Sequence, residues 1–150
     1  MATVYPRRVM GVETEFGVAA FREGAAVLTP EEISRYLFRS VVAAHRSSNI
    51  FTDNASRLYL DVGSHPEYAT AECDSVTQLL NYDKAGELIY DHLAAEAEQA
   101  LTDDRVGGNV FLFKNNVDSK GNSYGTHENY LISRAVSYTH LRAHETGRNL

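Results

Sequence analysis

The sequence predicts an α+β fold, with a largely antiparallel sheet and helices beside it. Short segments of strand character recur at residues 9–20, 57–62, 67–72, 109–114 and 127–134. Only two stretches show helical periodicity, and strands follow one another directly on either side of the second stretch. This order of strand, helix, paired strands, long helix, strand and strand differs from the regular strand–helix alternation that builds a parallel sheet.

The first strand is expected over residues 9–20, VMGVETEFGVAA. Side chains two positions apart on a strand point to the same face, so Glu13 and Glu15 would share one face of the sheet. Acidic residues are disfavoured in strands. This pair of carboxylates is therefore the first candidate for a functional site.

A helix start follows at residues 29–32, Thr-Pro-Glu-Glu. Thr29 can cap the helix, Pro30 suits the first helical position, and Glu32 stands where the carboxylate of a capping box belongs. The helix would present one apolar stripe to the core. That stripe consists of Ile33, Tyr36, Leu37, Val41 and Ala44.

Two neighbouring strands are expected at residues 57–62 and 67–72, separated by a His-Pro pair that favours an extended or turning backbone. A long helix follows, capped by Asp74 or Ser75 and running to about Leu101. Turn-prone residues at 81–83 could divide this helix. Its core face would consist of Val76, Leu79, Leu80, Leu88, Ile89 and Leu93.

The last expected strands are a buried one at 109–114 and another at 127–134. Near Ala135 the pattern changes abruptly, and residues 136–150, VSYTHLRAHETGRNL, continue neither a strand nor a helix. This stretch resembles a translated sequencing adapter. We therefore expect residues 1–135 to be the N-terminal part of one domain and residues 136–150 to be a non-native tail.

Composition narrows the classes of function. The net charge of −6 supplies no basic stripe for phosphate backbones, which argues against nucleic acid as a partner. A single cysteine, Cys73, excludes an internal disulfide and suits a reducing cytoplasm. No signal peptide and no apolar run long enough to span a membrane is visible, so a cytoplasmic location without membrane contact is expected.

Chemistry-bearing residues concentrate in RLYLDVG, residues 57–63. Arg57, Tyr59 and Asp61 alternate with aliphatic residues, so a strand would place a cation, a phenol and a carboxylate on one face. An ordinary amphipathic strand with a hydrated polar face would show the same pattern. The segment alone therefore leaves both interpretations open.

The number of nearby carboxylates favours a site. Glu13, Glu15, Asp61, Glu67 and Glu72 all lie in strand-like segments. If the sheet gathers them, cations must offset their repulsion, and hard oxygen ligands select Mg²⁺ or Mn²⁺, which usually accompany nucleotide phosphates. An arginine beside them offers a fork for phosphate oxygens. Because no P-loop and no kinase-type glycine loop is present, the pattern indicates phosphoryl transfer of another kind.

Six segments taken together, in this order and spacing, resemble the N-terminal part of the Pup ligase family (proteasome accessory factor A). They are GVETEFGV, LTPEEISRYLFRSVV, RSSNIF, RLYLDVGSHPEYATAECDS, FLFKNN and SYGTHENYLI. The resemblance covers roughly residues 6–135. It implies a truncated catalytic domain of the glutamine synthetase-like, carboxylate–amine ligase superfamily, in which a curved sheet lines the active site.

The resemblance also implies roles for individual residues. It implies Mg²⁺ ligands at Glu13, Tyr59 and Glu67, ATP contacts at Arg57 and Thr70, and a catalytic base at Asp61. Glu67 and Thr70 have opposite parity along a strand, so both reach the site only if a bulge or bend lies between them. A neutral tyrosine is an unusual Mg²⁺ ligand, and its assignment depends on the resemblance.

The implied reaction has two steps. ATP phosphorylates the side-chain carboxyl of the C-terminal glutamate of Pup, a small protein modifier, and a lysine of a target protein then attacks to form an isopeptide bond. The product is marked for the bacterial proteasome. Because the family completes its nucleotide pocket with residues further along the chain, we expect the 150-residue polypeptide to be aggregation-prone and inactive alone.

Two alternative activities fit the same residues: a depupylase of the same superfamily and a small-molecule glutamate–amine ligase. The depupylase family carries a longer insertion between the first strand and the RLY strand, and a different sequence beside HPEY. The shorter spacing between Gly17 and Arg57 here, and the sequence DVGSHPEYATAECDS, favour the ligase. Four side chains near the site stay open: His65 could act directly or brace its turn, and His127, Asn129 or Glu15 could join the metal ligands.

Overall fold

The computed structural model describes residues 8–114, 121 and 124–131, and it confirms the α+β prediction. The elements in chain order are β1 (Met10–Glu15), β2 (Gly17–Arg22), β3 (Ala25–Ala26), α1 (Pro30–Leu37), α2 (Arg39–His45), β4 (Asn49–Phe51), β5 (Arg57–Leu60), β6 (Pro66–Ala69), α3 (Val76–Asp103), β7 (Asn109–Phe113) and β8 (Thr126–Tyr130). Every strand pairing in this described part is antiparallel.

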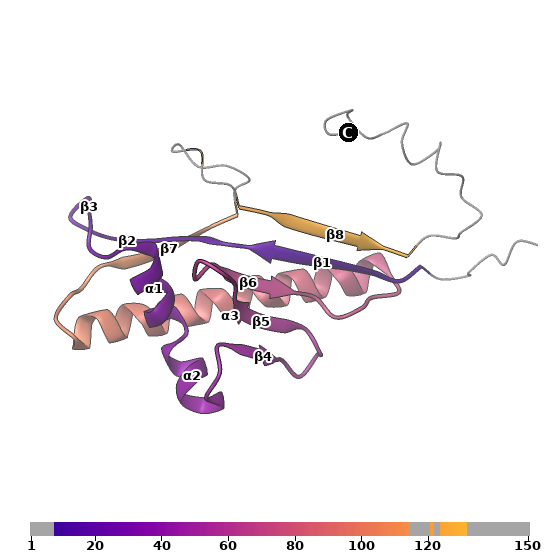
Figure 1. Ribbon diagram of the computed structural model, residues 1–150, viewed down its shortest axis with the longest axis horizontal. Coiled ribbons are helices and arrows are strands. Elements are labelled where there is room, and N and C mark those ends of the chain that lie inside the picture. Colours follow the sequence, from indigo (N-terminus) through magenta and orange to yellow (C-terminus); the bar gives the residue numbers. More distant parts are fainter. Residues whose placement is uncertain (1–7, 115–120, 122–123, 132–150) are drawn as a thin grey trace, which may run out of the picture.

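The strands form two sheets that share one long run of chain. The larger sheet has the order β4-β5-β6-β1-β8, and the smaller one has the order β3-β2-β7. β1 passes into β2 at Phe16, so residues expected to form one strand belong to both sheets. Figure 1 shows this run beside β8, with α3 extending along the strands and α1 and α2 beside it.

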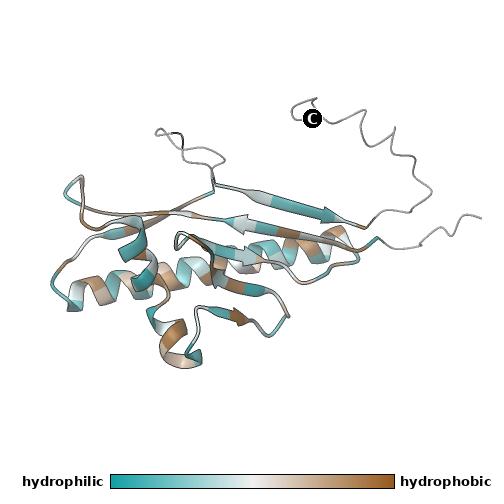
Figure 2. Ribbon diagram, viewed as in Figure 1, coloured by the Kyte–Doolittle hydropathy of each residue, from teal (hydrophilic) through white to brown (hydrophobic). Residues whose placement is uncertain are grey.

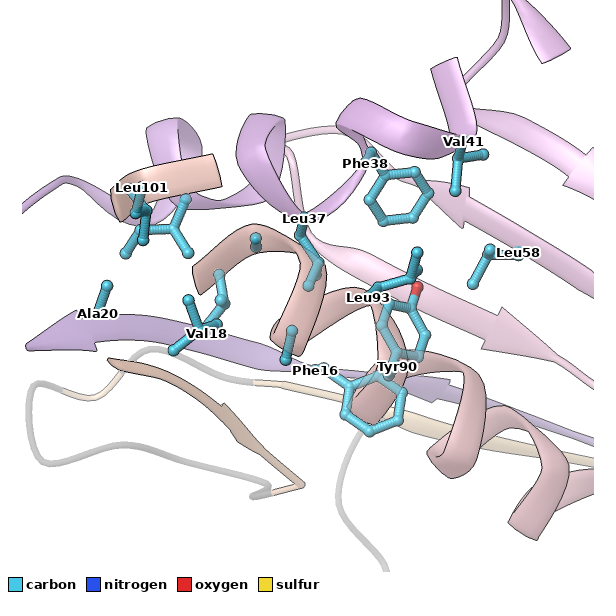
Figure 3. Packing of buried hydrophobic residues seen from close by; sticks show 14 of the residues in the cluster. Phe16, Val18, Ala20, Leu37, Phe38, Val41, Leu58, Tyr90, Leu93 and Leu101 are labelled. Carbon is cyan, nitrogen blue, oxygen red and sulfur yellow. The ribbon is translucent and has the colours of Figure 1, made fainter. Parts of the chain in front are cut away.

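The core lies between the helices and one face of the sheets. Alternate residues of β2, such as Val18 and Ala20, point into it and meet Leu37 and Leu101 from α1 and α3. Figure 3 shows this packing at close range. Strand side chains of the opposite parity therefore lie on the other face of the sheet. That second face carries Glu13 and Glu15, as the sequence predicted.

The first helix begins as expected but ends early. Thr29 accepts a hydrogen bond from the Glu32 N–H, and Glu32 Oε2 accepts one from the Thr29 N–H at 2.8 Å, which completes the capping box. The helical run breaks at Phe38, and α2 starts after it in a new direction. Ala44 is exposed for this reason, so its assignment to the apolar stripe was wrong.

The predicted core face of the long helix was correct only in part, since Leu93 is buried and Ile89 packs against the core. α3 runs unbroken through residues 81–83, and Val76, Leu80 and Leu88 are exposed. The buried face is made of Gly86, Tyr90, Leu93, Ala94, Ala97 and Leu101. Three of these six residues are small, which lets the helix lie close against the sheet, and hydropathy alone does not find such a face. Figure 2 shows hydrophobic and hydrophilic stretches alternating along α3.

Gly86 is the point of closest approach between α3 and the sheet. A Cβ atom at this position would lie 2.3 Å from the ring of Tyr68, which is itself buried on β6. We expect Gly86→Ala to destabilise the fold by about 1–3 kcal/mol, because overpacking outweighs the gain in helix propensity. Urea unfolding measures this. Adding Tyr68→Leu should recover part of the loss, and equal losses in both backgrounds would contradict the steric explanation.

A bulge follows β6. Glu13 pairs with Ala69, whereas Met10 pairs with Cys73, so two residues of β1 (11–12) face three residues on the other strand (70–72). One extra residue therefore sits in the second strand. This is the irregularity that the opposite parities of Glu67 and Thr70 required.

Two strands, β7 and β8, lie near the C-terminal end of the described residues. β7 was predicted as a buried strand, yet its residues alternate, with Val110 buried and Phe111 exposed, because only one face meets the helices. β8 confirms the beginning of the strand expected at 127–134 and is mostly hydrophilic (Figure 2). Residues 136–150 lie outside the described residues. None of the helices in the described part is long and apolar enough to cross a membrane.

Candidate metal and nucleotide site

Strand register brings the predicted side chains together on the face of the sheet turned away from α3. Tyr59 on β5 lies opposite Glu67 on β6, and Glu67 lies opposite Glu15 on β1. These three form one row across the sheet. Glu13 lies in the neighbouring row, opposite His127 of β8. Residues paired in register share a face, so the carboxylates must project together.

The hydroxyl of Tyr59 is the centre of this cluster. It lies 2.7 Å from Glu67 Oε2 and is also in contact with Glu13 Oε1. A phenol has one proton to donate, and ionised carboxylates only accept. Two charged carboxylates cannot both be satisfied by this hydroxyl. Either one of them carries a proton, or a cation takes the place of that proton.

The raised pKa of Glu67 also indicates that the cluster lacks positive charge. Glu67 is only 7% exposed, and its pKa is raised to about 7. Burial is the largest cause, and the negative charges of Asp61, Glu13 and Glu15 contribute to the same shift. Within the described residues, no lysine or arginine forms an ion pair with Glu13, Glu15 or Glu67.

Histidine is the nearest partial compensation. His127 Nδ1 lies 2.8 Å from Glu13 Oε2, and this hydrogen bond and the charge of Glu13 raise the pKa of His127. Asn129 pairs with Gly11, and each lies two positions from the pair formed by His127 and Glu13. Asn129 therefore lies on the same face as His127. The expectation that these two side chains point together is consistent with this register. Whether either binds a metal stays a prediction.

Arg57 lies beside the cluster without entering it. Its guanidinium carbon is 4.0 Å from the centre of the Tyr59 ring, and its Nε donates to Asn49 Oδ1 at 2.9 Å. Stacking and this hydrogen bond fix the plane of the guanidinium. The terminal nitrogens have no protein partner in the described part, so they can meet an anion.

The bulge places Thr70 at a cleft next to Glu13. The cleft has a volume of about 550 Å³ and is lined by residues of β1, β8 and the bulge, including Glu13, Thr70 and Asn129. The Thr70 hydroxyl accepts a hydrogen bond from the Val12 N–H at 3.0 Å. The hydroxyl also forms a side-chain hydrogen bond with Cys73. A phosphate oxygen in the cleft would be a stronger acceptor for its proton than the thiol.

Asp61 stands in an exposed turn after β5. The Asp61 N–H donates to the His65 carbonyl at 3.0 Å, and the Ser64 N–H donates to the Asp61 carbonyl at 2.9 Å. Gly63 and Ser64 adopt positive φ angles of 90° and 64°, which close this turn. The carboxylate of Asp61 is near enough to raise the pKa of Glu67. Asp61 is therefore accessible to solvent and adjacent to the cluster.

His65 braces the turn that carries Asp61. Its Nδ1 contacts Glu15 Oε1, while Glu15 Oε2 accepts a hydrogen bond from the Gly125 N–H at 2.8 Å. Both oxygens of Glu15 thus have protein partners. Of the two roles that the sequence left open for His65, this geometry favours bracing.

The cluster fits a hard cation in its chemistry, although it is incomplete as a cage. No group of three His, Cys, Asp or Glu side chains within the described part of the chain converges closely enough to hold a metal ion. Glu13, Glu67 and the Tyr59 hydroxyl nevertheless offer oxygen donors only, which is the set that Mg²⁺ prefers. Mg²⁺ commonly completes such a set with water and substrate phosphates.

The open face of the antiparallel sheet is acidic, and Arg57 and the cleft that contains Thr70 lie beside it. This arrangement suits the class of ATP-dependent carboxylate–amine ligase that the sequence resembles. The chain belongs to the Pup-ligase family, since the family model described as Pup-ligase protein matches residues 8–146. The depupylase alternative is not favoured, because the similar curated proteins cited below are all named ligases.

Curated relatives are similar over most of this chain. It is 60% identical over 135 residues to the Pup--protein ligase of Gordonia bronchialis and 62% identical over 138 residues to that of Corynebacterium urealyticum. The Mycobacterium tuberculosis protein of the same name is 59% identical over 135 residues. These matches cover 90–92% of the chain but only 27–30% of each relative. The chain thus spans about a third of the length of these proteins or less.

Two solved structures are similar to this one. A crystal structure of the complex between prokaryotic ubiquitin-like protein Pup and its ligase PafA matches with a TM-score of 0.85 and 56% identity, covering 90% of this chain and 27% of that one. A structure of the Pup ligase PafA in complex with ADP matches with a TM-score of 0.58 and 57% identity, covering 81% and 25%. The described fold is therefore similar to that of about a quarter of the PafA chain.

Proposed function

We propose that this chain forms the metal- and ATP-binding part of a ligase that joins the side-chain carboxyl of the C-terminal glutamate of Pup to a lysine of a target protein. The observation that carries this proposal is the single Tyr59 hydroxyl held between the carboxylates of Glu13 and Glu67, neither of which pairs with a lysine or arginine in the described part of the chain. Membership of the family and the likeness to PafA bound to Pup, and to PafA bound to ADP, support the identity of the substrates.

In this proposal Glu13, Tyr59 and Glu67 hold Mg²⁺. The ion would offset the charge of the triphosphate and of the phosphoryl group in transfer. Arg57 binds phosphate oxygens with its free terminal nitrogens, in a plane already fixed by the Tyr59 ring. Thr70 donates its hydroxyl proton to the nucleotide from the adjoining cleft.

The second step depends on Asp61. A lysine amine is mostly protonated at neutral pH and is not a nucleophile in that form. Asp61 is exposed in its turn and adjacent to the carboxylate cluster, so an incoming lysine can reach it. It would accept the amine proton as the nitrogen attacks the glutamyl phosphate, and His65 and Glu15 keep its turn in place.

We also infer that the protein works in the cytoplasm, where ATP and the target proteins are found. A single buried thiol, Cys73, is consistent with a reducing compartment.

A chimera tests the function. Residues 1–131 are continued by the corresponding remainder of the Gordonia bronchialis ligase, and this protein is called the completed ligase below. We expect the completed ligase, with ATP and Mg²⁺, to attach Pup to a lysine-bearing protein, as read by a gel shift and mass spectrometry. The 150-residue chain alone should show no ligation above background, because the relatives are about three times longer.

The same assay separates the alternatives. Release of Pup from a purified conjugate without ligation would identify a depupylase, and ATP turnover stimulated by free glutamate but not by Pup would identify a small-molecule ligase. Either result would overturn the proposal.

A further inference from the structure

A buried tyrosine lies directly behind Glu67, on the opposite side of the sheet from the carboxylate cluster. The Tyr90 hydroxyl donates a hydrogen bond of 2.8 Å to the backbone carbonyl of Glu67. Tyr90 belongs to α3 and is fully buried. This bond ties the strand residue that bears the carboxylate to the longest helix of the fold.

Tyr90 is itself held in place. Its ring centre lies 4.6 Å from that of Phe16 and 6.2 Å from that of Phe38. Figure 3 shows the Tyr90 ring among these core side chains. A ring packed on two sides in a dense core has little freedom to follow a moving strand. The position of the hydroxyl is therefore set by the core and not by β6.

A second contact one helical turn earlier acts on the next residue of the strand. Tyr68 packs its ring onto the backbone of α3 at Gly86, where a Cβ would come within 2.3 Å of it. Residues 86 and 90 are four apart and share one face of the helix. The same face of α3 thus contacts Glu67 through its backbone carbonyl and Tyr68 through its side chain.

We infer that Tyr90 is a positioning residue of the proposed metal site, which fixes the backbone of Glu67 so that its carboxylate meets the Tyr59 hydroxyl and the cation. The inference depends on the proposed function, because it concerns the same site. Groups that orient a metal ligand from behind typically contribute 10–100-fold to metal affinity. Tyr90 touches neither metal nor substrate and acts only through Glu67.

The test uses Tyr90→Phe in the completed ligase, since this change keeps the ring and removes the hydroxyl. Titration calorimetry with MgCl₂ alone should show a dissociation constant about tenfold higher than that of the unaltered protein. In the ligation assay, half-saturation by Mg²⁺ should rise by a similar factor, while kcat at saturating Mg²⁺ stays within about twofold.

Two control variants separate positioning from general stability. Ile33→Val removes one buried methylene from α1, away from β6, and lowers the melting temperature without touching Glu67. Tyr82→Phe removes a hydroxyl from the same helix at a partly exposed position. Both should leave the Mg²⁺ dissociation constant unchanged. If Tyr90→Phe does not fold, Phe16→Leu carries the test, because it loosens the Tyr90 ring and should weaken Mg²⁺ binding about threefold.

The outcomes are distinct. An unchanged dissociation constant in Tyr90→Phe would overturn the inference while leaving the proposed function intact. The inference would also be overturned if Ile33→Val raised the Mg²⁺ dissociation constant as much as Tyr90→Phe does, at an equal loss of melting temperature. The effect would then come from lower stability. If the unaltered completed ligase neither binds Mg²⁺ nor ligates Pup, the proposed function fails and the inference falls with it.

Discussion

Asp61→Asn in the completed ligase should lower the rate of isopeptide formation by about 100-fold or more, in the range by which a general base accelerates proton transfer. Asparagine keeps the shape of the side chain but cannot take a proton from lysine. ATP binding should be unchanged, because Asp61 stands in an exposed turn and contacts neither Arg57 nor Thr70 in the described structure. Ligation rate and nucleotide affinity measured on the same preparation check this.

Hydroxylamine makes the test specific to the base. It is largely unprotonated at neutral pH, so it should react with the glutamyl phosphate without help and restore turnover in Asp61→Asn. Asp53→Asn, the same change in the exposed turn between β4 and β5, is the matched control and should ligate normally. Undiminished ligation by Asp61→Asn, or failure of hydroxylamine to restore turnover, would contradict the role of Asp61 as base.

Glu67→Gln should have two opposite effects, on metal binding and on stability. The pKa of Glu67 is raised to about 7 in the folded protein, against 4.5 for an ordinary glutamate. The folded state then holds a proton that the unfolded state has lost between these two values. Stability of the metal-free protein therefore falls as pH rises from about 4.5 to 7, by about 3 kcal/mol.

Glutamine removes this charge and its pH dependence. Metal-free Glu67→Gln should melt at a higher temperature than the unaltered protein at pH 8, and at about the same temperature at pH 5. It should also lose the rise in melting temperature that Mg²⁺ gives the unaltered completed ligase, together with nearly all ligation. Thermal unfolding at both pH values, with and without MgCl₂, measures each effect.

Glu72→Gln serves as the control for this substitution. Glu72 lines the adjoining cleft but is exposed and lies outside the cluster around Tyr59. It should change neither the pH dependence nor the response to Mg²⁺ by more than a small amount. A Glu67→Gln protein that keeps Mg²⁺ stabilisation would exclude Glu67 as a ligand.

Local rules predicted the parts of the fold that depend on neighbours in sequence. The capping box at Thr29 and Glu32 needs only residues three apart, and the shared face of Glu13 and Glu15 needs only strand parity. The bulge after β6 was expected from the resemblance, which implies that Glu67 and Thr70 reach one site although their parities differ. These inferences required no knowledge of which elements pack together.

What the sequence could not predict depends on distant partners. The buried face of α3 contains Gly86 and two alanines, which hydropathy does not single out, and Gly86 is buried by the close approach of Tyr68. Tyr90 was missed for the same reason, since nothing near it in sequence indicates that its hydroxyl meets Glu67. Phe38, at the break between α1 and α2, likewise has a distant partner, since its ring lies 6.2 Å from that of Tyr90.

The extra residue between Glu67 and Cys73 has a consequence for how this part of the protein can change in evolution. Deleting one residue there would restore a regular ladder with β1 and move the threonine hydroxyl to the opposite side of the sheet, away from the cleft. Replacing a side chain in the same stretch would leave the spacing intact. Apart from Thr70, the residues of this segment can therefore change in identity more readily than the segment can change in length.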